Sequence, residues 1–126
     1  MVTWILWALI LAMLAWMGFN YLRIRRAAKI VDNEEFEALI RTGQLIDLRD
    51  PAEFHRKHIL GARNIPSSQL KTSLAALRKD KPVLLYENQR AQRVTNAALY
   101  LKKQGFSEIY ILSYGFDSWK GKVKTS

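Results

Sequence analysis

The chain has 126 residues, 49% of them hydrophobic, and carries a formal net charge of +9. This length and composition favour one ordinary folded domain with a short appendage, and they disfavour a repeat array or a disordered chain. The lack of cysteine excludes disulfides, thiolate metal sites and every reaction that needs a cysteine nucleophile on this chain. His55 and His58 have no third ligand set nearby in the sequence, so we expect neither a metal site nor a cofactor.

An apolar stretch without a charged side chain runs from Val2 to Leu22. At about 1.5 Å per residue, a helix over this stretch is about 31 Å long, close to a hydrocarbon core of about 30 Å. A cleaved signal peptide is disfavoured because no Lys or Arg precedes Arg23 and because residues 16–21 are bulky. A core or surface helix is disfavoured because the stretch is apolar all round. We therefore predict a transmembrane helix over residues 1–22.

A basic flank over residues 23–29 follows the apolar stretch, and its cations are Arg23, Arg25, Arg26 and Lys29. The positive-inside rule then predicts that the N-terminus lies outside and the following domain in the cytoplasm. We expect a single-pass protein of a bacterial-type plasma membrane. The flank could also bind anionic lipid headgroups, although a plain stop-transfer role explains it. Without these four cations, 16 Lys and Arg remain against 11 Asp and Glu, and no nucleic-acid-binding motif accompanies this charge, so we expect no nucleic-acid partner.

Residues 30–126 read as a domain in which strand-length apolar runs alternate with helical stripes. The expected strands are 29–32, 45–48, 83–86 and 108–112. The expected helices are one capped by Asp32 and stopped by Gly43, a short one starting at Pro51, one capped by Ser67 or Ser68 that runs through Leu70, Leu74 and Leu77, one over 91–104 closed by Gly105, and a last short one at 116–119. This alternation predicts an α/β fold with a mostly parallel sheet and helices on both faces. Ligands of such folds bind beyond the carboxyl ends of the strands, which singles out the loop after Tyr86.

Several motifs in this domain resemble one known signature. They are Asp47-Leu48-Arg49, Glu53-Phe54, His58-Ile59, Gly61-Ala62, Asn64-Ile65-Pro66 and, near the end, Leu112, Gly115 and Trp119. In this order and spacing the chain is similar to the rhodanese-like domain family from about residue 29 to residue 122. Lys57, Leu60 and Tyr114 stand where that family usually has Gly, Pro and Gly. The resemblance implies the rhodanese-like fold, preceded here by the transmembrane helix.

The family's active loop follows the central strand as C-x-x-G-x-R-S, and its cysteine carries a persulfide. Strand register places Glu87 at the cysteine position, whereas counting back from Gly105 places Asn88 there and puts Arg93 on the family's arginine. Neither register supplies a sulfur, so the resemblance implies that the family's sulfur transfer is absent. The degenerate loop comprises Glu87, Asn88, Gln89, Arg90, Ala91, Gln92 and Arg93.

The charged residues around this loop suggest binding more than catalysis. A Glu87 carboxylate at a helix N-terminus should have a lowered pKa and act as a built-in anion. Arg90 and Arg93 could pair with it or point outward to a phosphate, a carboxylate or an acidic partner. The resemblance implies that a second set of residues supports the neighbouring loops through ion pairs and hydrogen bonds, namely Asp47, Arg49, Glu53 and His58.

The sequence thus predicts a catalytically inactive, membrane-anchored module that binds a protein partner or a small anion through residues 87–93. One alternative is an enzyme, either one that uses Glu87 and the arginines or one that receives a cysteine from a partner chain. Another is a membrane adaptor whose working surface is the basic tail around Lys120, Lys122 and Lys124.

Overall fold

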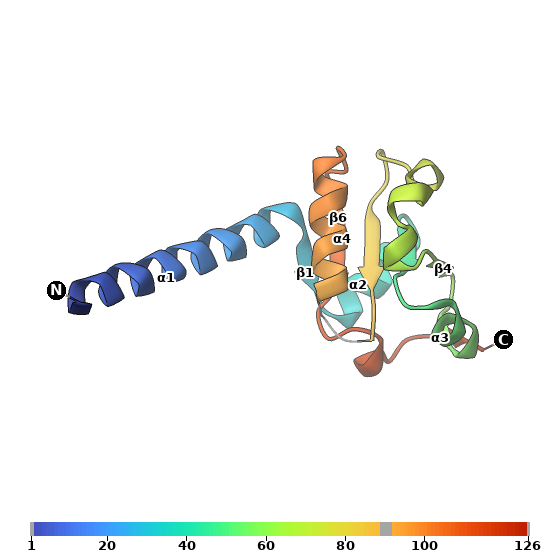
Figure 1. The fold of residues 1–126 in the computed structure, drawn as a ribbon. Helices are drawn as coiled ribbons and strands as arrows, with labels where there is room; N and C mark the ends of the chain where they lie inside the picture. Colours follow the sequence, from blue (N-terminus) through green and yellow to red (C-terminus); the bar gives the residue numbers. More distant parts are fainter. Residues whose placement is uncertain (1, 89–91, 126) are drawn as a thin grey trace.

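The computed structural model describes residues 2–88 and 92–125, and for residues 23–27 it describes the backbone alone. A long N-terminal helix leads into an α/β domain (Figure 1). The helices are α1 (Val2–Ala27), α2 (Asn33–Ile40), α3 (Pro51–Arg56) and α4 (Gln92–Lys103), with 3-10 segments η1 (Ser67–Gln69), η2 (Lys71–Ala76) and η3 (Phe116–Ser118). The strands are β1 (Lys29–Val31), β2 (Gln44–Asp47), β3 (His58–Ile59), β4 (Arg63–Asn64), β5 (Val83–Tyr86), β6 (Ile109–Leu112) and β7 (Val123–Lys124).

The main sheet has five parallel strands in the order β1-β6-β5-β2-β4. Its central strand is β5, in which Leu84 pairs with Leu45 of β2 on one side and with Tyr110 of β6 on the other. All residues of β5 are buried, as expected for a parallel strand that is covered on both faces. The parallel sheet predicted from the sequence is therefore confirmed.

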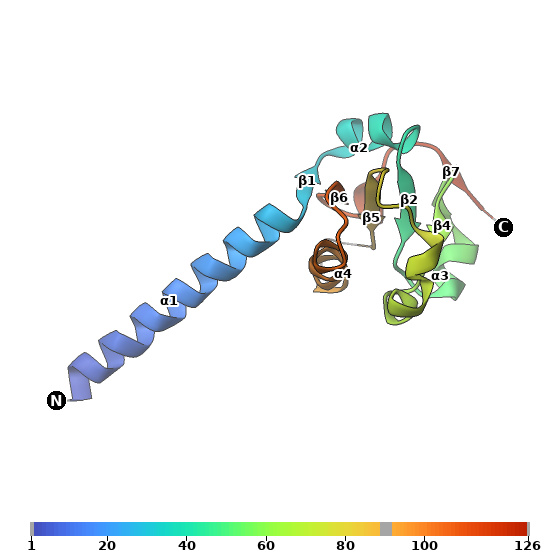
Figure 2. The same ribbon diagram turned by 90° about the horizontal axis from the view of Figure 1, so that it is seen from above.

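Helices cover both faces of the sheet, with α2 on one side of β5 and β6 and α4 on the other (Figure 2). Side chains alternate along β5, so Leu85 enters the core under α4, whereas Leu84 and Tyr86 enter the core under α2. Phe36 of α2 is fully buried against the Tyr86 ring, in an edge contact with centroids 6.5 Å apart. These two cores fix the carboxyl end of β5, from which the candidate loop departs.

Most predicted helix ends are present. The Asp32 side chain accepts a hydrogen bond from the Glu35 N–H at 2.9 Å and caps α2. Helix α4 closes at Gly105, whose φ of +99° lies in the left-handed region that favours glycine. Gly43 is needed for a different reason from the one expected. It lacks a positive φ, and a Cβ there would collide with the Cδ1 of Leu84, so the glycine leaves room for this buried side chain.

The α-helix predicted over residues 67–77 is wrong. The segment forms the two 3-10 segments η1 and η2, without a side-chain cap from Ser67 or Ser68. The Thr72 hydroxyl donates to the Gln69 carbonyl at 2.9 Å, and such side-chain bonds compete with α-helical hydrogen bonding. The predicted apolar side of the segment is nevertheless used, because Leu70 and Leu77 are buried in the core under α4.

The basic tail around Lys120, Lys122 and Lys124 takes part in a two-stranded sheet. Val123 pairs with Ile59 in the antiparallel β3–β7 ladder, and the Leu60 N–H donates to the Lys122 carbonyl at 3.0 Å. Strands of two residues are too short to leave a readable alternation, so the sequence did not predict this pair.

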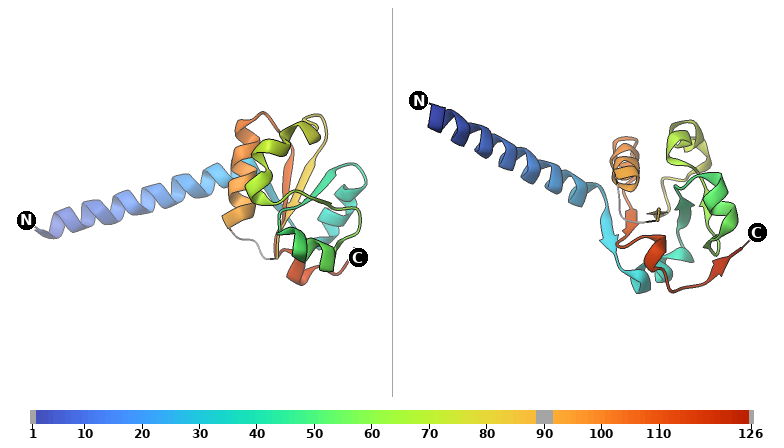
Figure 3. Two further views of the ribbon diagram at one scale, coloured as in Figure 1. Left: turned by 45° about the vertical axis from the view of Figure 1, so that its right-hand side comes forward. Right: turned by 60° about the horizontal axis from the view of Figure 1, so that its bottom comes forward.

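Helix α1 projects away from the domain (Figure 3). Its part from Val2 to Leu22 is long and apolar enough to span a membrane, and none of that window is buried against the rest of the protein. Helix α1 also contacts α4, and Ala28, the residue after α1, is buried in the core under α4. Lys29 is exposed at the start of β1, whereas the side chains of Arg23, Arg25 and Arg26 lie outside the described residues.

Candidate functional site

The loop that leaves β5 is held by its backbone. The Phe116 N–H donates to the Glu87 carbonyl at 2.7 Å, and the Asp117 N–H donates to the Asn88 carbonyl at 2.9 Å. Both donors belong to η3, which follows β6, the neighbour of β5. The site therefore lies at the carboxyl edge of the sheet, where the sequence placed it. The predicted loop residues Gln89, Arg90 and Ala91 lie outside the described residues.

The Glu87 side chain turns toward α4. Its Oε2 accepts a hydrogen bond from the Val94 N–H at 2.8 Å and satisfies one of the free donors in the first turn of that helix. Burial raises the pKa of Glu87, because it outweighs the opposing effects of the Val94 N–H and the Arg93 charge, and the Glu53 charge adds to the rise. The expected lowered pKa is therefore wrong. The helix terminus does stabilise the carboxylate, but desolvation is the larger effect.

The Asn88 side chain turns the other way, toward α3. Its Nδ2 donates to Glu53 Oε2 at 2.6 Å, and its Oδ1 accepts from Arg49 Nη1 at 3.2 Å. Asn88 thus links two of the four predicted supporting residues to the loop itself. The sequence did not reveal this role, because Asn88 is far in the chain from Arg49 and from Glu53 of α3, and the sheet topology brings them together.

A buried ion pair lies beneath Asn88. Arg49 Nη2 is 2.8 Å from Asp47 Oδ2, and these residues are 5% and 0% exposed. The Tyr86 hydroxyl donates to the same Asp47 oxygen at 2.7 Å and accepts from the Ile59 N–H at 3.2 Å. Burial, with the Asp47 charge beside it, raises the pKa of Tyr86 well above its usual value. A buried pair needs such additional hydrogen bonds to offset its desolvation.

His58 supports the wall of the site and lies apart from the loop. Its Nδ1 is 2.7 Å from the Phe54 carbonyl oxygen, and its ring stacks on the Phe54 ring with centroids 3.8 Å apart. The side chain is buried at the junction of α3 and β3. This is the hydrogen-bonding role that the sequence suggested for it.

Arg93 points away from the hydrogen-bonding network. Its Nη1 is 3.8 Å from Asp50 Oδ1, and both side chains are more than half exposed. An exposed pair of this length contributes about 0–1 kcal/mol. The Arg93 guanidinium therefore remains accessible to a ligand. The other predicted arginine, Arg90, lies outside the described residues.

A cleft of about 330 Å³ opens beside Asn88, and its lining residues are Arg49, Glu53, Arg56, Lys57, Asn88, Phe116 and Asp117. We call it the loop cleft. It combines cations, carboxylates and one aromatic ring, which suits a charged or polar group of a partner. The described residues contain no group of three His, Asp or Glu that could hold a metal ion. The side chains that line the cleft can form ion pairs and hydrogen bonds.

Comparisons with known proteins agree with this architecture. The family model of the rhodanese-like domain matches residues 32–122. The chain is 49% identical over 113 residues to the uncharacterized protein YqhL of Bacillus subtilis, which covers 90% of this chain and 89% of that protein. It is 37% identical over 95 residues to the thiosulfate sulfurtransferase GlpE of Stutzerimonas stutzeri, covering 73% and 84% of the two chains. A rhodanese-related protein from Thermoplasma volcanium shares the fold with a TM-score of 0.70 at 23% identity, covering 78% and 99%. The chain therefore belongs to the rhodanese-like domain family.

Proposed function

We propose that this protein is a membrane-anchored rhodanese-like module that does not transfer sulfur and that binds a protein partner through its degenerate active-site loop. One observation carries the proposal. The first two loop residues are held by side-chain hydrogen bonds, from Glu87 to α4 and from Asn88 to Arg49 and Glu53, although no cysteine is present to be positioned. The position of the family's reactive loop is thus kept, and polar side chains that can bind a partner stand there in place of the cysteine.

Sulfur transfer through a persulfide requires a cysteine thiolate, and this chain has none. The relative from Stutzerimonas stutzeri is named a thiosulfate sulfurtransferase, but the cysteine chemistry of such enzymes cannot pass to a chain without sulfur at the loop. At α4, the Glu87 carboxylate already occupies the Val94 N–H. An incoming anion would have to displace it from that position.

The loop cleft supports the choice of a protein partner. Arg49 and Asn88 are fixed by buried neighbours, so little side-chain freedom is lost when a partner binds them. Arg56 and Asp117 are exposed at the edge of the cleft and present opposite charges. Arg56 and Lys57 are exposed cations of the lining, and a partner segment that carries an acidic side chain could pair with them.

The exposed apolar helix and the basic residues after it support the membrane placement. A helix from Val2 to Leu22 with no buried residues gains a partner for its apolar surface in a bilayer. Arg23, Arg25, Arg26 and Lys29 follow it directly, and by the positive-inside rule this charge favours a domain in the cytoplasm beneath the plasma membrane.

Acid–base catalysis at Glu87 is a second candidate, which the raised pKa favours. In that case a substrate-dependent activity of the full-length protein would be lost on Glu87→Gln. The same activity would survive Lys103→Gln, a change at an exposed position at the far end of α4.

A crosslinking pull-down of the full-length protein from native membranes tests the main proposal. The loop variant carries Arg56→Ala, Asn88→Ala and Asp117→Ala, and a matched tail variant carries Lys120→Ala, Lys122→Ala and Lys124→Ala. We expect a partner that the wild type and the tail variant capture and that the loop variant loses while it remains folded by circular dichroism. A partner that is lost only with the tail variant would instead assign the function to the basic tail.

A further inference from the structure

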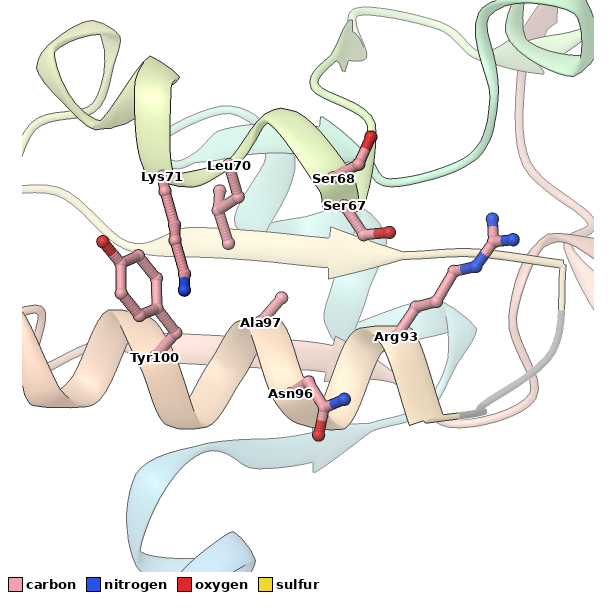
Figure 4. Close-up of a pocket in the computed structure, with 8 residues that line it drawn as sticks. All are labelled: Ser67, Ser68, Leu70, Lys71, Arg93, Asn96, Ala97 and Tyr100. Carbon is pink, nitrogen blue, oxygen red and sulfur yellow. The ribbon is translucent and has the colours of Figure 1, made fainter.

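A second cleft of about 230 Å³ lies between the 3-10 segments η1 and η2 and helix α4 (Figure 4). We call it the α4 cleft, and its lining residues are Ser67, Ser68, Leu70, Lys71, Arg93, Asn96, Ala97 and Tyr100. It shares no lining residue with the loop cleft. The two clefts can therefore be tested separately.

The polar groups of the α4 cleft select for an anion. Its charged lining residues are the cations Lys71 and Arg93, and no carboxylate is among the lining residues. Figure 4 shows Arg93 at one end, with the Ser67 hydroxyl pointing toward it, and Lys71 beside Tyr100 at the other end. Lys71 Nζ lies 5.6 Å from the centroid of the Tyr100 ring, a cation–π contact that holds the ammonium group over the cleft.

The space between the two cations is apolar. Leu70 and Ala97 are 3% and 4% exposed and belong to the core under α4. The Tyr100 ring adds an aromatic wall that packs partly against the same core. A ligand that fits both features has an anionic head and a short carbon body.

An external anion has reason to bind here instead of at the N-terminus of α4. The Glu87 carboxylate already accepts the Val94 N–H in the first helical turn. Arg93, on the same turn, forms one weak exposed ion pair with Asp50 among the described residues, and its charge also acts on Glu87. Its planar guanidinium can offer two parallel N–H donors to the oxygens of one phosphate.

We propose that the α4 cleft binds an organic phosphate. Arg93 and Ser67 hold the phosphate oxygens at one end of the cleft. The carbon body of the ligand lies on Leu70 and Ala97. At the Tyr100 end, Lys71 binds another oxygen of the same ligand. The same chemistry is available from a soluble phosphorylated metabolite and from the headgroup of an anionic phospholipid. Helix α1 contacts α4, which forms one wall of the cleft, so the phospholipid is tested beside the soluble ligand.

The test uses the full-length protein in lipid nanodiscs. One arm titrates glycerol 3-phosphate into protein in phosphatidylcholine nanodiscs, and the other raises the phosphatidylglycerol fraction of the phosphatidylcholine nanodiscs stepwise. The readout in every protein is the NMR signals of the backbone amides of residues 67–71, and the Arg93 side-chain signal is added in the proteins that keep Arg93. The cleft variants are the single changes Arg93→Gln and Lys71→Gln, and the controls with matched charge are the single changes Lys102→Gln and Lys103→Gln, at exposed positions in the last turn of α4.

We expect saturable shifts in at least one arm, weakened about tenfold or more by either cleft variant and unchanged in the controls. Shifts with glycerol 3-phosphate identify a soluble ligand, and shifts only with phosphatidylglycerol identify a lipid headgroup. Either result supports the site. The proposal is overturned if neither arm saturates, or if the controls lose as much binding as the cleft variants, because the effect would then be general electrostatic attraction.

Discussion

The Glu87 carboxylate accepts the backbone N–H of Val94 at 2.8 Å, so the anion at the N-terminus of α4 is supplied by the chain itself. In the family that this chain resembles, a cysteine that carries a persulfide occupies the corresponding loop. Here the neighbouring Asn88 turns to the opposite side and joins Arg49 to Glu53. The two residues after β5 therefore fasten the loop to two different parts of the domain.

The first prediction concerns the cap that Glu87 provides. Glu87→Ala removes the acceptor for the Val94 N–H and should lower the free energy of unfolding by about 1 kcal/mol, with faster amide hydrogen exchange in the first turn of α4. Glu87→Gln keeps an oxygen acceptor and should retain most of this protection. Equal loss in the two variants would show that the hydrogen bond is not what stabilises the helix end.

The second prediction follows from the raised pKa of Glu87. Between its ordinary value of 4.5 and the raised value, the folded protein binds more protons at this group than the unfolded protein does. Its contribution to stability is therefore full at low pH and is lost as the pH rises through that window. Glu87→Gln should remove this part of the pH dependence, measured as the difference between the denaturation midpoints of the two proteins from pH 4 upward. A difference that does not change with pH would contradict the assignment.

The third prediction concerns the Asn88 bridge. Asn88→Asp replaces the amide donor by a carboxylate next to Glu53, whose Oε2 is 2.6 Å from the Asn88 amide nitrogen in the wild type. The lost hydrogen bond and the like charges should destabilise the protein by about 1–2 kcal/mol in thermal unfolding. Adding Glu53→Gln supplies a donor and removes one charge, so the double variant should recover most of the loss. If the second change gives no recovery, Asn88 and Glu53 are not coupled.

The fourth prediction concerns the buried hydroxyl of Tyr86. Tyr86→Phe leaves Asp47 without one donor and the Ile59 N–H without its acceptor, while the ring packing is kept. Both groups are buried, so the expected loss is about 1–3 kcal/mol in chemical denaturation. Tyr110→Phe, at a partly exposed position of β6, serves as the control and should change the midpoint little.

Local patterns in the sequence predicted the elements that depend on them. The apolar run of β5, the stripe of α4 and the cap at Asp32 all follow from residues that are close in the chain. The short strands β3 and β7 could not be predicted, because their pairing joins residues from distant parts of the chain. The leucines of residues 67–77 correctly predicted which side of that segment is buried, but they did not predict its 3-10 hydrogen bonding.

The candidate site, too, could be predicted from the sequence only in part. The charged residues around the loop could be selected by type and by resemblance, and the place of Glu87 at α4 followed from strand and helix order. Its pKa could not be predicted, because burial depends on how α4, α3 and the loop pack together. The link through Asn88 and the α4 cleft depend likewise on contacts between segments that are distant in sequence.

Site-specific photo-crosslinking in native membranes tests the central claim most directly. A photoreactive amino acid replaces Arg56 or Asp117 at the edge of the loop cleft, or Lys103 or Glu108 at the opposite edge of the sheet, and all four positions are exposed. If the degenerate loop binds a partner, the first two positions should give the same discrete protein adduct and the last two should not. Adducts that are equally strong from all four positions, or that come only from Lys103 and Glu108, would contradict a binding role for the loop.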